Sequence, residues 1–291
     1  MLCSREINTA MKKNVQLLAL AAVALALLCS VGCDKLKARD QLNKGVKAYK
    51  DNHPEQAIDN FQRAIQFDPA LLNARMYLAT TLVSQYIPGM DTPDNLRIAQ
   101  QAIDEYQKVI EANPSKEQKK NSAKGIAYLY LNMKKWDDAK KFYRMASDQD
   151  PNDPEPYYSI GVIDWTACYQ PRMEERNKLG IKPEEHLNAK NKDQKKLCED
   201  LKTKNSPAIQ EGIDSLKKAI DLRPNYDDAM AYMNLMYRER ADVECEDEAA
   251  RSADLKEADR WVDETMAAKK ANAEAAAKAS GGGITVDQTN K

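Results

Sequence analysis

The chain has 291 residues, of which 31% are charged and 7% aromatic, with ten glycines and a formal net charge of −1. This near balance of charge excludes the broad basic face that a nucleic-acid-binding protein presents. The scarcity of Gly beside abundant Ala, Leu, Lys and Glu favours helices, because straight-chain side chains lose little rotamer freedom in a helix. We therefore expect an all-α protein.

Residues 1–32 have the features of a bacterial export signal. Lys12 and Lys13 form a short basic stretch, and an uncharged apolar run follows from Val15 to Leu28. A run of this length suits the h-region of a signal peptide better than a transmembrane helix. Met11 is the more natural start of the chain, because the residues before it add no signal feature.

The end of this segment resembles the bacterial lipoprotein signal, in which a small residue precedes a lipidated cysteine. Gly32 and Cys33 match that signal, whereas Ser30 stands where the family prefers Leu. The resemblance implies cleavage before Cys33, lipidation of Cys33, and a tether over residues 33–37. The alternative is an uncleaved N-terminal anchor. In both cases we expect a periplasm-facing protein of the bacterial envelope, attached to the inner or the outer membrane.

Four short phrases in the rest of the chain each end in Pro after an amphipathic run. Each phrase carries a small or β-branched residue five positions before the Pro, a large apolar residue three positions earlier, and Ala or Gly four positions earlier still. In chain order the sets are Ala57, Phe61, Ala64 and Pro69; Ala102, Tyr106, Val109 and Pro114; Ala139, Tyr143, Ala146 and Pro151; and Gly212, Leu216, Ala219 and Pro224.

This pattern resembles the tetratricopeptide repeat (TPR), a helix-turn-helix unit of about 34 residues. The small residues let the second helix lie close to the first, the large residue fills the space between them, and the proline ends the unit. The resemblance implies a right-handed superhelical solenoid of about five such units over residues 38–266. A fifth unit after Pro224 lacks a closing proline and is expected to act as a cap. Residues 267–291 are expected to form a frayed helix and a disordered tail.

The four prolines are separated by 45, 37 and 73 residues, so some units carry insertions. We place these between the helices of repeat two (Tyr86–Leu96), repeat four (Cys168–Ser206) and repeat five (Ala241–Ser252), with an extra helix over Glu184–Lys204. Because the same turn of every repeat lies along one edge of a solenoid, the insertions should share one rim. That rim is either a working surface or tolerated decoration.

Three cysteines, Cys168, Cys198 and Cys245, lie in or beside these insertions. In an oxidising periplasm such clustering permits one disulfide among three possible pairings, and we predict Cys168 with Cys198. A zinc site is a poor alternative, because the chain has no Cys-x2-Cys pair and its two histidines lack ligand spacing. We expect no metal and no cofactor. We assign no catalytic residue, since the sequence shows no phosphate loop, nucleophile elbow or triad base.

The resemblance also implies a peptide-binding groove, lined by the first helix of each unit. Carried over position by position, its residues are Leu42, Val46, Tyr49, Met76, Lys124, Tyr128, Leu131, Asn132, Tyr158, Val162, Trp165, Leu235 and Arg238. Tyr128, Tyr158 and Trp165 would form an apolar strip, and aromatic residues with a polar atom are favoured at binding surfaces. The alternative is that Tyr158 and Trp165 pack against the extra helix of the long insertion.

This scaffold serves many partners, so it indicates a class of function and not a specific one. We expect a membrane-anchored lipoprotein that acts as a protein–protein interaction adaptor or scaffold in the envelope, binding protein or peptide partners and no nucleic acid. One alternative is a structural subunit of an envelope assembly machine, of the pilus or outer-membrane-assembly type. A less favoured one is an enzyme accessory. We expect no enzymatic activity.

Overall fold

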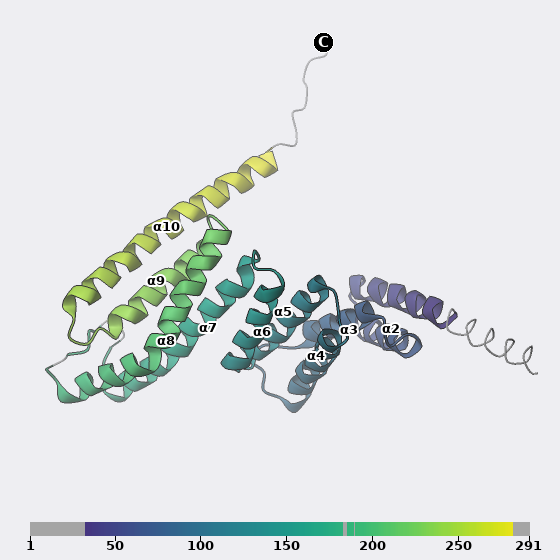
Figure 1. The fold of residues 1–291 in the computed structure, drawn as a ribbon, viewed down its shortest axis with the longest axis horizontal. Helices are drawn as coiled ribbons and strands as arrows, with labels where there is room; N and C mark the ends of the chain where they lie inside the picture. The colour runs from purple at the N-terminus through teal and green to yellow at the C-terminus, as the bar shows by residue number, and fades with distance from the viewer. Residues whose placement is uncertain (1–32, 183–184, 189, 282–291) are drawn as a thin grey trace, which may run out of the picture. The chain divides into compact units, whose positions relative to one another are not determined.

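The computed structural model describes residues 33–281, apart from residues 183–184 and 189. Within these ranges the chain forms helices joined by short connections and contains no strand (Figure 1), which confirms the predicted all-α class. The residues divide into two compact units that meet inside one helix, between Gly125 and Ile126. No helix in the described part of the chain is long and apolar enough to cross a membrane. The predicted signal segment lies outside the described residues.

The first unit contains the first two helix pairs. It starts with a helix that ends at residue 50 and continues with α2 (Pro54–Phe67), α3 (Leu72–Gln85), α4 (Pro93–Glu111) and part of α5 (Lys116–Asn132). α3 packs against both α2 and α4. Pro54 and Pro93 occupy first-turn positions where the missing N–H removes no helical hydrogen bond, and Thr92 caps α4 by accepting from its backbone.

The second unit contains the rest of α5, then α6 (Trp136–Gln149), α7 (Pro154–Lys178), α8 (Lys192–Leu222), α9 (Asp227–Asp242) and α10 (Glu248–Gly281). α7 pairs with α8 and α9 pairs with α10, as Figure 1 shows, and α9 also packs against α7 and α8. Asp153 caps α7 and Asn191 caps α8, each by accepting hydrogen bonds from backbone N–H groups of the first turn.

The residues of the repeat signature occupy the positions that the pattern predicts. The small residue five before each proline is completely buried in all four phrases (Ala64, Val109, Ala146 and Ala219), and the large residue before it is at most 6% exposed. The prolines themselves lie just beyond the ends of α2, α4, α6 and α8. The spacing therefore predicts both which side chains fill the core and where the second helix of each pair ends.

Two glycines show how closely the helices of a pair approach. A Cβ atom at Gly45 would lie 2.5 Å from the Phe61 ring, and one at Gly161 would lie 2.4 Å from the Leu216 side chain. Contacts this short cannot exist, so these positions admit no side chain without movement of the partner. In repeats one and four, the first helix thus provides a glycine where the large residue of the second helix packs.

The long insertion of repeat four lengthens both helices of the pair and forms no separate helix. α7 continues through Cys168 for three more turns, and α8 runs as one helix from Lys192 to Leu222 with Pro207 inside it. The predicted extra helix over Glu184–Lys204 is therefore wrong as a separate element, although residues 192–204 are helical as the first part of α8. Pro207 does not end α8, because buried residues on both sides of it, including Asn205 and Ile209, keep the helix packed against its neighbours.

The other two insertions behave differently from each other. The insertion of repeat two is a loop, as predicted, and buried Asn95 holds it: the side-chain oxygen accepts from Ile87 N at 2.8 Å, and the side-chain amide donates to the carbonyls of Ile87 and Met90 at 2.8 and 2.7 Å. In repeat five, α9 extends to Asp242 and α10 begins at Glu248, so most of that insertion is helical. The shared rim and the superhelix, which involve both units, stay predictions.

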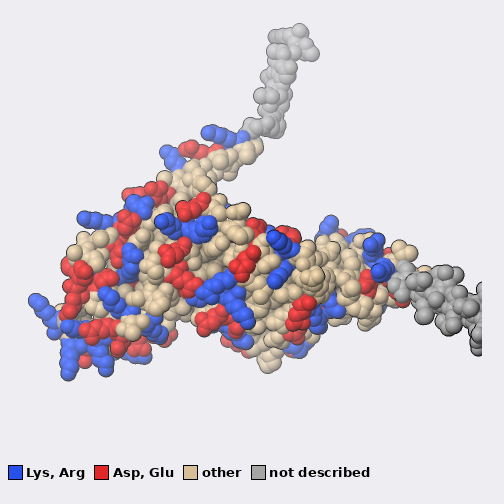
Figure 2. Space-filling view, in the orientation of Figure 1, with Lys and Arg blue, Asp and Glu red and all other residues tan. Residues whose placement is uncertain are grey.

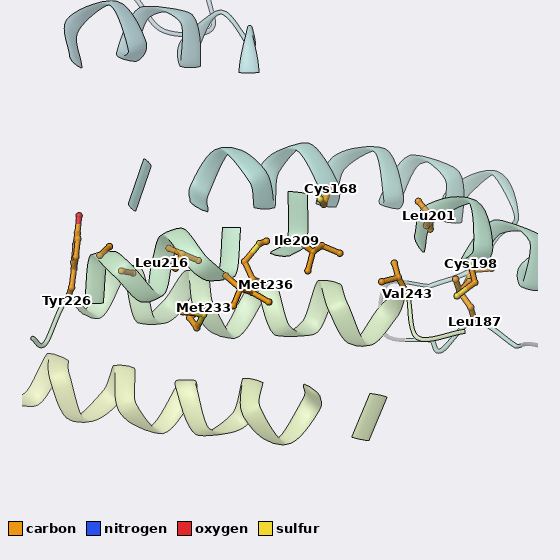
Figure 3. Packing of buried hydrophobic residues seen from close by; sticks show 14 residues of the cluster. Cys168, Leu187, Cys198, Leu201, Ile209, Leu216, Tyr226, Met233, Met236 and Val243 are labelled. Atoms are coloured by element: carbon orange, nitrogen blue, oxygen red, sulfur yellow. The ribbon is translucent and has the colours of Figure 1, made fainter. Parts of the chain in front are cut away.

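The core of the second unit lies between α7, α8 and α9. Figure 3 shows Ile209 and Leu216 of α8 beside Met233 and Met236 of α9, with Cys168 on α7. All five side chains are at most 1% exposed. A set of half-buried aromatic side chains packs against this core, and it forms the surface described next.

Candidate functional site

Five aromatic rings of the second unit form a continuous chain, which we call the aromatic strip: Tyr226, Tyr158, Tyr232, Trp165 and Tyr169. Successive ring centroids are 5.0, 5.8, 5.5 and 4.8 Å apart in that order. These separations are typical of favourable aromatic pairs. The strip joins α7 to the start of α9, the first helices of two consecutive repeats.

Helix geometry explains how the rings come together. Tyr158, Trp165 and Tyr169 are separated by seven and four residues along α7, so they lie on one side of that helix. Tyr232 of α9 meets both Tyr158 and Trp165 edge-on, with interplanar angles of 75° and 76°. Tyr232 of α9 therefore lies between Tyr158 and Trp165 of α7, while Trp165 stacks on Tyr169 of its own helix at an interplanar angle of 20°.

An arginine lies over the ring at each end of the strip. The Arg223 guanidinium is 4.1 Å from the Tyr226 centroid, and that of Arg172 is 5.3 Å from the Tyr169 centroid. Arg223 also forms an ion pair with Glu155 at 2.8 Å. The Glu155 carboxylate in turn accepts a hydrogen bond from the Tyr226 hydroxyl at 3.1 Å. These contacts fix the end rings in place by cation–π attraction and charge-assisted hydrogen bonds.

The four rings other than Tyr226 are half-buried and keep their polar atoms available. Among the described residues, the hydroxyls of Tyr158, Tyr169 and Tyr232 and the indole N–H of Trp165 have no hydrogen-bond partner, and none of these atoms is shut off from solvent. Burial raises the pKa of Tyr158 to about 12 and also raises that of Tyr232. Both hydroxyls therefore stay protonated near neutral pH and can donate.

The residues predicted to line a groove are distributed over both units. Three of them are exposed: Tyr49 (37%) in the first unit, and Tyr128 (40%) and Arg238 in the second. The others are partly buried; they are Leu42, Val46, Met76 and Lys124 in the first unit and Leu131, Asn132, Tyr158, Val162, Trp165 and Leu235 in the second. Tyr49 lines a pocket of about 350 Å³ with Ser84 and Gln85. Arg238 pairs with Asp259 of α10 at 2.9 Å.

Of the three residues predicted to form an apolar strip on the groove, two lie in the aromatic strip, and their role in a groove stays a prediction. Tyr158 and Trp165 belong to one chain of rings, but no ring contact among the described residues joins Tyr128 to it. The helix named in the predicted alternative is part of α8 and not a separate element. Tyr158 and Trp165 pack against the core cluster of α7, α8 and α9, and both also contact Tyr232 of the next repeat.

Sequence reasoning missed Tyr169, Tyr226 and Tyr232. Tyr169 was assigned to the insertion, although its place four residues after Trp165 would identify it once α7 is known to continue. Tyr226 precedes the first turn of α9, and Tyr232 lies at a position that the family pattern does not assign to the groove. No signal in the sequence alone marks these two residues.

A polar cluster, separate from the aromatic strip, joins α6, α7 and α8. Lys140 donates to Asp164 at 2.6 Å and to Glu211 at 2.9 Å, and Arg144 pairs with Glu211. Asp164 is only 1% exposed, and its second oxygen has no partner among the described residues. Desolvation therefore raises its pKa to about 6, although Lys140 opposes this shift. Asp164 and Lys140 line a pocket of about 530 Å³.

A buried ion network closes the far end of α7. Arg172 makes a two-pronged contact with Glu239, with distances of 2.7 and 2.8 Å, and also pairs with Asp242. Arg176, fully buried, donates to the Lys182 carbonyl at 2.7 Å and to the Glu185 carbonyl. The network attaches the connection between α7 and α8 to α9. Its carboxylates are occupied by these arginines, so we assign it a structural role.

The disulfide joins Cys198 to Cys245, with their Cα atoms 5.6 Å apart. The predicted Cys168–Cys198 pair is wrong, and Cys168 is a free, buried thiol. The reason is the continuity of α7: Cys168 points into the core between the helices, whereas Cys198 reaches the connection between α9 and α10. Lys202–Glu244 and Lys195–Glu246 ion pairs, at 2.8 and 2.5 Å, flank the disulfide.

Charge and metal-binding groups give no further site. Positive and negative side chains are interspersed over the face shown in Figure 2, as expected from the near-neutral composition. In the described ranges no group of three or more His, Cys, Asp or Glu side chains could hold a metal ion.

Comparison with known proteins shows the fold. No protein-family model and no curated protein matches the chain. Among solved structures it is similar to MamA, at 12% identity and a TM-score of 0.53, over 82% of this chain and 94% of that one. A MamA from Desulfovibrio magneticus RS-1 gives 15% identity and 0.51, over 81% and 96%. YrrB, described as a TPR protein with an unusual peptide-binding site, gives 13% identity and 0.47, over 80% and 90%.

The likeness to MamA extends over most of both chains. It therefore shows that the helix pairs described above form the same kind of all-helical, TPR-like fold, as the repeat signature predicts. At this level of identity it shows the fold alone.

Proposed function

We propose that this chain is an interaction adaptor of the bacterial envelope, which is anchored by lipid at Cys33, binds a protein partner through the aromatic strip and catalyses no reaction. The observation that carries the proposal is the strip itself: apart from Tyr226, its rings are half-buried on consecutive first helices and carry hydroxyl or indole donors that no described residue uses. Aromatic side chains that combine a large apolar surface with one polar atom dominate the binding energy of many interfaces.

The strip is also built to keep its form without a partner. Its rings pack against the buried core of α7, α8 and α9, and arginines at both ends hold Tyr226 and Tyr169. A surface that is already ordered loses little conformational entropy on binding, which favours affinity.

Support for the anchor comes from the sequence. The apolar run before Gly32 and Cys33 matches a lipoprotein signal, and the Cys33 thiol is free and exposed. A lipid on this residue would tether the repeats to a membrane surface, and the strip begins more than 120 residues further along the chain.

Photo-cross-linking in living cells tests the proposal. A photoreactive phenylalanine analogue replaces Tyr232 in the full chain, and the control carries it at Glu199, an exposed residue of α8 outside the strip. We expect position 232, and not position 199, to cross-link to an envelope protein. Equal labelling from both positions, or none from 232, would contradict the proposal. A single stoichiometric complex containing the partner would favour the assembly-subunit alternative.

A further inference from the structure

The aromatic strip offers two kinds of contact in a regular order. Tyr158 and Trp165 contribute partly exposed rings from α7, and Tyr232 lies between them at nearly a right angle to both. Seven residues separate Tyr158 from Trp165, which is about 10.5 Å along a helix. Each of these three residues also carries a donor that no described residue uses. A complementary ligand therefore needs flat apolar groups at a spacing near 10 Å, with hydrogen-bond acceptors between them.

A polyproline II segment has this chemistry. It has three residues per turn and rises about 3.1 Å per residue, so every third side chain recurs on one side at about 9.3 Å. The proline rings are flat and apolar, and the backbone carbonyls have no internal hydrogen-bond partner. Aromatic surfaces recognise such segments by packing against the proline rings, and the preformed extended chain loses little entropy on binding. An α-helical ligand would offer no free carbonyls along its length.

The charge beside the strip adds a further constraint. Asp228 is exposed at the start of α9, is close enough to raise the pKa of both Tyr158 and Tyr232, and has no ion-pair partner among the described residues. A carboxylate in this position favours a basic residue of the ligand next to the ring contacts.

We infer that the aromatic strip binds a proline-rich segment of the partner in the polyproline II conformation. Prolines three residues apart pack against Tyr158 and Trp165 on either side of Tyr232. The hydroxyls of Tyr158 and Tyr232 and the Trp165 indole donate to the carbonyls between them, and a lysine or arginine of the segment pairs with Asp228. This inference rests on the proposed function and names the kind of partner that the same surface takes.

Peptide titration of the full chain tests the inference. The probes are two synthetic peptides of matched length and charge, one of repeated Pro-Pro-Lys and one of repeated Gly-Gly-Lys. The affinity of each peptide is measured by calorimetry. We expect the proline peptide to bind at least about tenfold more tightly than the glycine peptide, because only the former is preformed and carries rings. Trp165→Ala should weaken its binding by about tenfold or more, the range of an interface anchor.

Substitutions that retain the aromatic rings distinguish an effect on binding from an effect on folding. Tyr158→Phe and Tyr232→Phe remove only the donors, so the fold remains, and each should weaken the proline peptide about three- to tenfold, as expected for one lost hydrogen bond. Tyr77→Phe removes a hydroxyl from an exposed tyrosine of α3, outside the strip, and should have no effect. Equal affinity for both peptides, or unchanged binding in both strip variants, would overturn the inference.

The outcomes also distinguish this inference from the proposed function. If neither peptide binds but the envelope partner still cross-links from position 232, the adaptor function stands and the polyproline inference fails. If an envelope oligosaccharide binds in a Trp165-dependent manner and the proline peptide does not, the strip is a glycan platform and both fail.

Discussion

Trp165 and Asp164 are adjacent in α7, yet they belong to different sites. Successive residues of a helix point about 100° apart, so Trp165 lies on the aromatic strip while Asp164 meets Lys140 of α6 and lies beside Gly212 of α8. One side chain is therefore partly exposed on the strip, and the other is a buried carboxyl group where α6, α7 and α8 meet.

Asp164→Asn should change how stability depends on pH. Burial raises the Asp164 pKa from 3.8 to about 6, so the folded protein holds this proton more tightly than the unfolded chain does. The carboxyl group therefore contributes stability that is complete below about pH 4 and is lost as the pH rises through about 6. Relative to the variant, the wild type should lose up to about 3 kcal/mol over this window.

Urea unfolding at a series of pH values measures this difference. The control is Asp138→Asn, an exposed carboxyl group that lines the same pocket, and it should follow the wild-type profile. Parallel profiles for wild type and Asp164→Asn would show that Asp164 is ionised at low pH and that its burial has little energetic effect.

Among individual residues, the sequence predicts some members of the site and cannot predict others. The repeat register identifies Tyr158 and Trp165, because both lie on the first helix of a unit whose phase is known. It cannot identify Tyr232, since the contact of that ring with two residues about 70 positions earlier depends on how α9 packs against α7. Nor does it show that Asp164 is buried, because a single Asp in a helix is usually solvated.

Among whole elements, α8 is the one whose structure departs most from expectation. Its first half, residues 192–204, was expected to be separate, but Cys198 and Leu201 lie on one side and are both nearly completely buried. Tertiary packing of this side outweighs the local effect of Pro207. By contrast, the helix pairs were predictable. The same spacing of small and large residues occurs four times in the sequence, and each occurrence is explained by the close packing of one helix against another.

Reduction of the disulfide should release the first half of α8 from the connection between α9 and α10. The two cysteines are separated by 47 residues, and the loop-entropy model gives about 4 kcal/mol of stabilisation for a loop of that length. We expect dithiothreitol to lower the melting temperature of the wild type and of Cys168→Ser. The Cys198→Ser/Cys245→Ser double variant should melt at the reduced value and show no response to dithiothreitol. A Cys168-containing disulfide in a non-reducing peptide map would contradict the observed pairing.

Gly161→Ala should destabilise the repeat-four helix pair. Alanine normally stabilises a helix relative to glycine, but here the new Cβ would lie 2.4 Å from the buried Leu216 side chain. Overpacking of this kind costs about 1–3 kcal/mol. In a double-mutant cycle with Leu216→Ala, the glycine substitution should lose its penalty because the truncated side chain leaves room. If the stability losses of Gly161→Ala and Leu216→Ala were strictly additive, contact between residue 161 and Leu216 would not limit how closely α7 and α8 approach.

For the whole molecule, the proposed lipid anchor at Cys33 would decide where the strip can act. Cys33→Ser should block lipidation and processing and leave a precursor larger than the mature protein, because cleavage of a lipoprotein signal depends on the modified cysteine. Mass spectrometry of the membrane fraction measures this. An identical mature mass for the variant and the wild type would contradict lipidation at Cys33.

The central proposal is that the aromatic strip of the second unit binds a protein partner. The most direct test compares Trp165→Ala with Trp261→Ala for affinity toward the cross-linked envelope partner, each beside a thermal melt. Both tryptophans are half-buried and both lie on helices of the second unit, but Trp261 is on α10, outside the strip. We predict that Trp165→Ala weakens partner binding about tenfold or more, at a stability loss smaller than the 3–5 kcal/mol typical of a core aromatic, whereas Trp261→Ala leaves affinity unchanged. Unchanged affinity of folded Trp165→Ala, together with a core-sized loss of stability, would contradict the binding role of the strip.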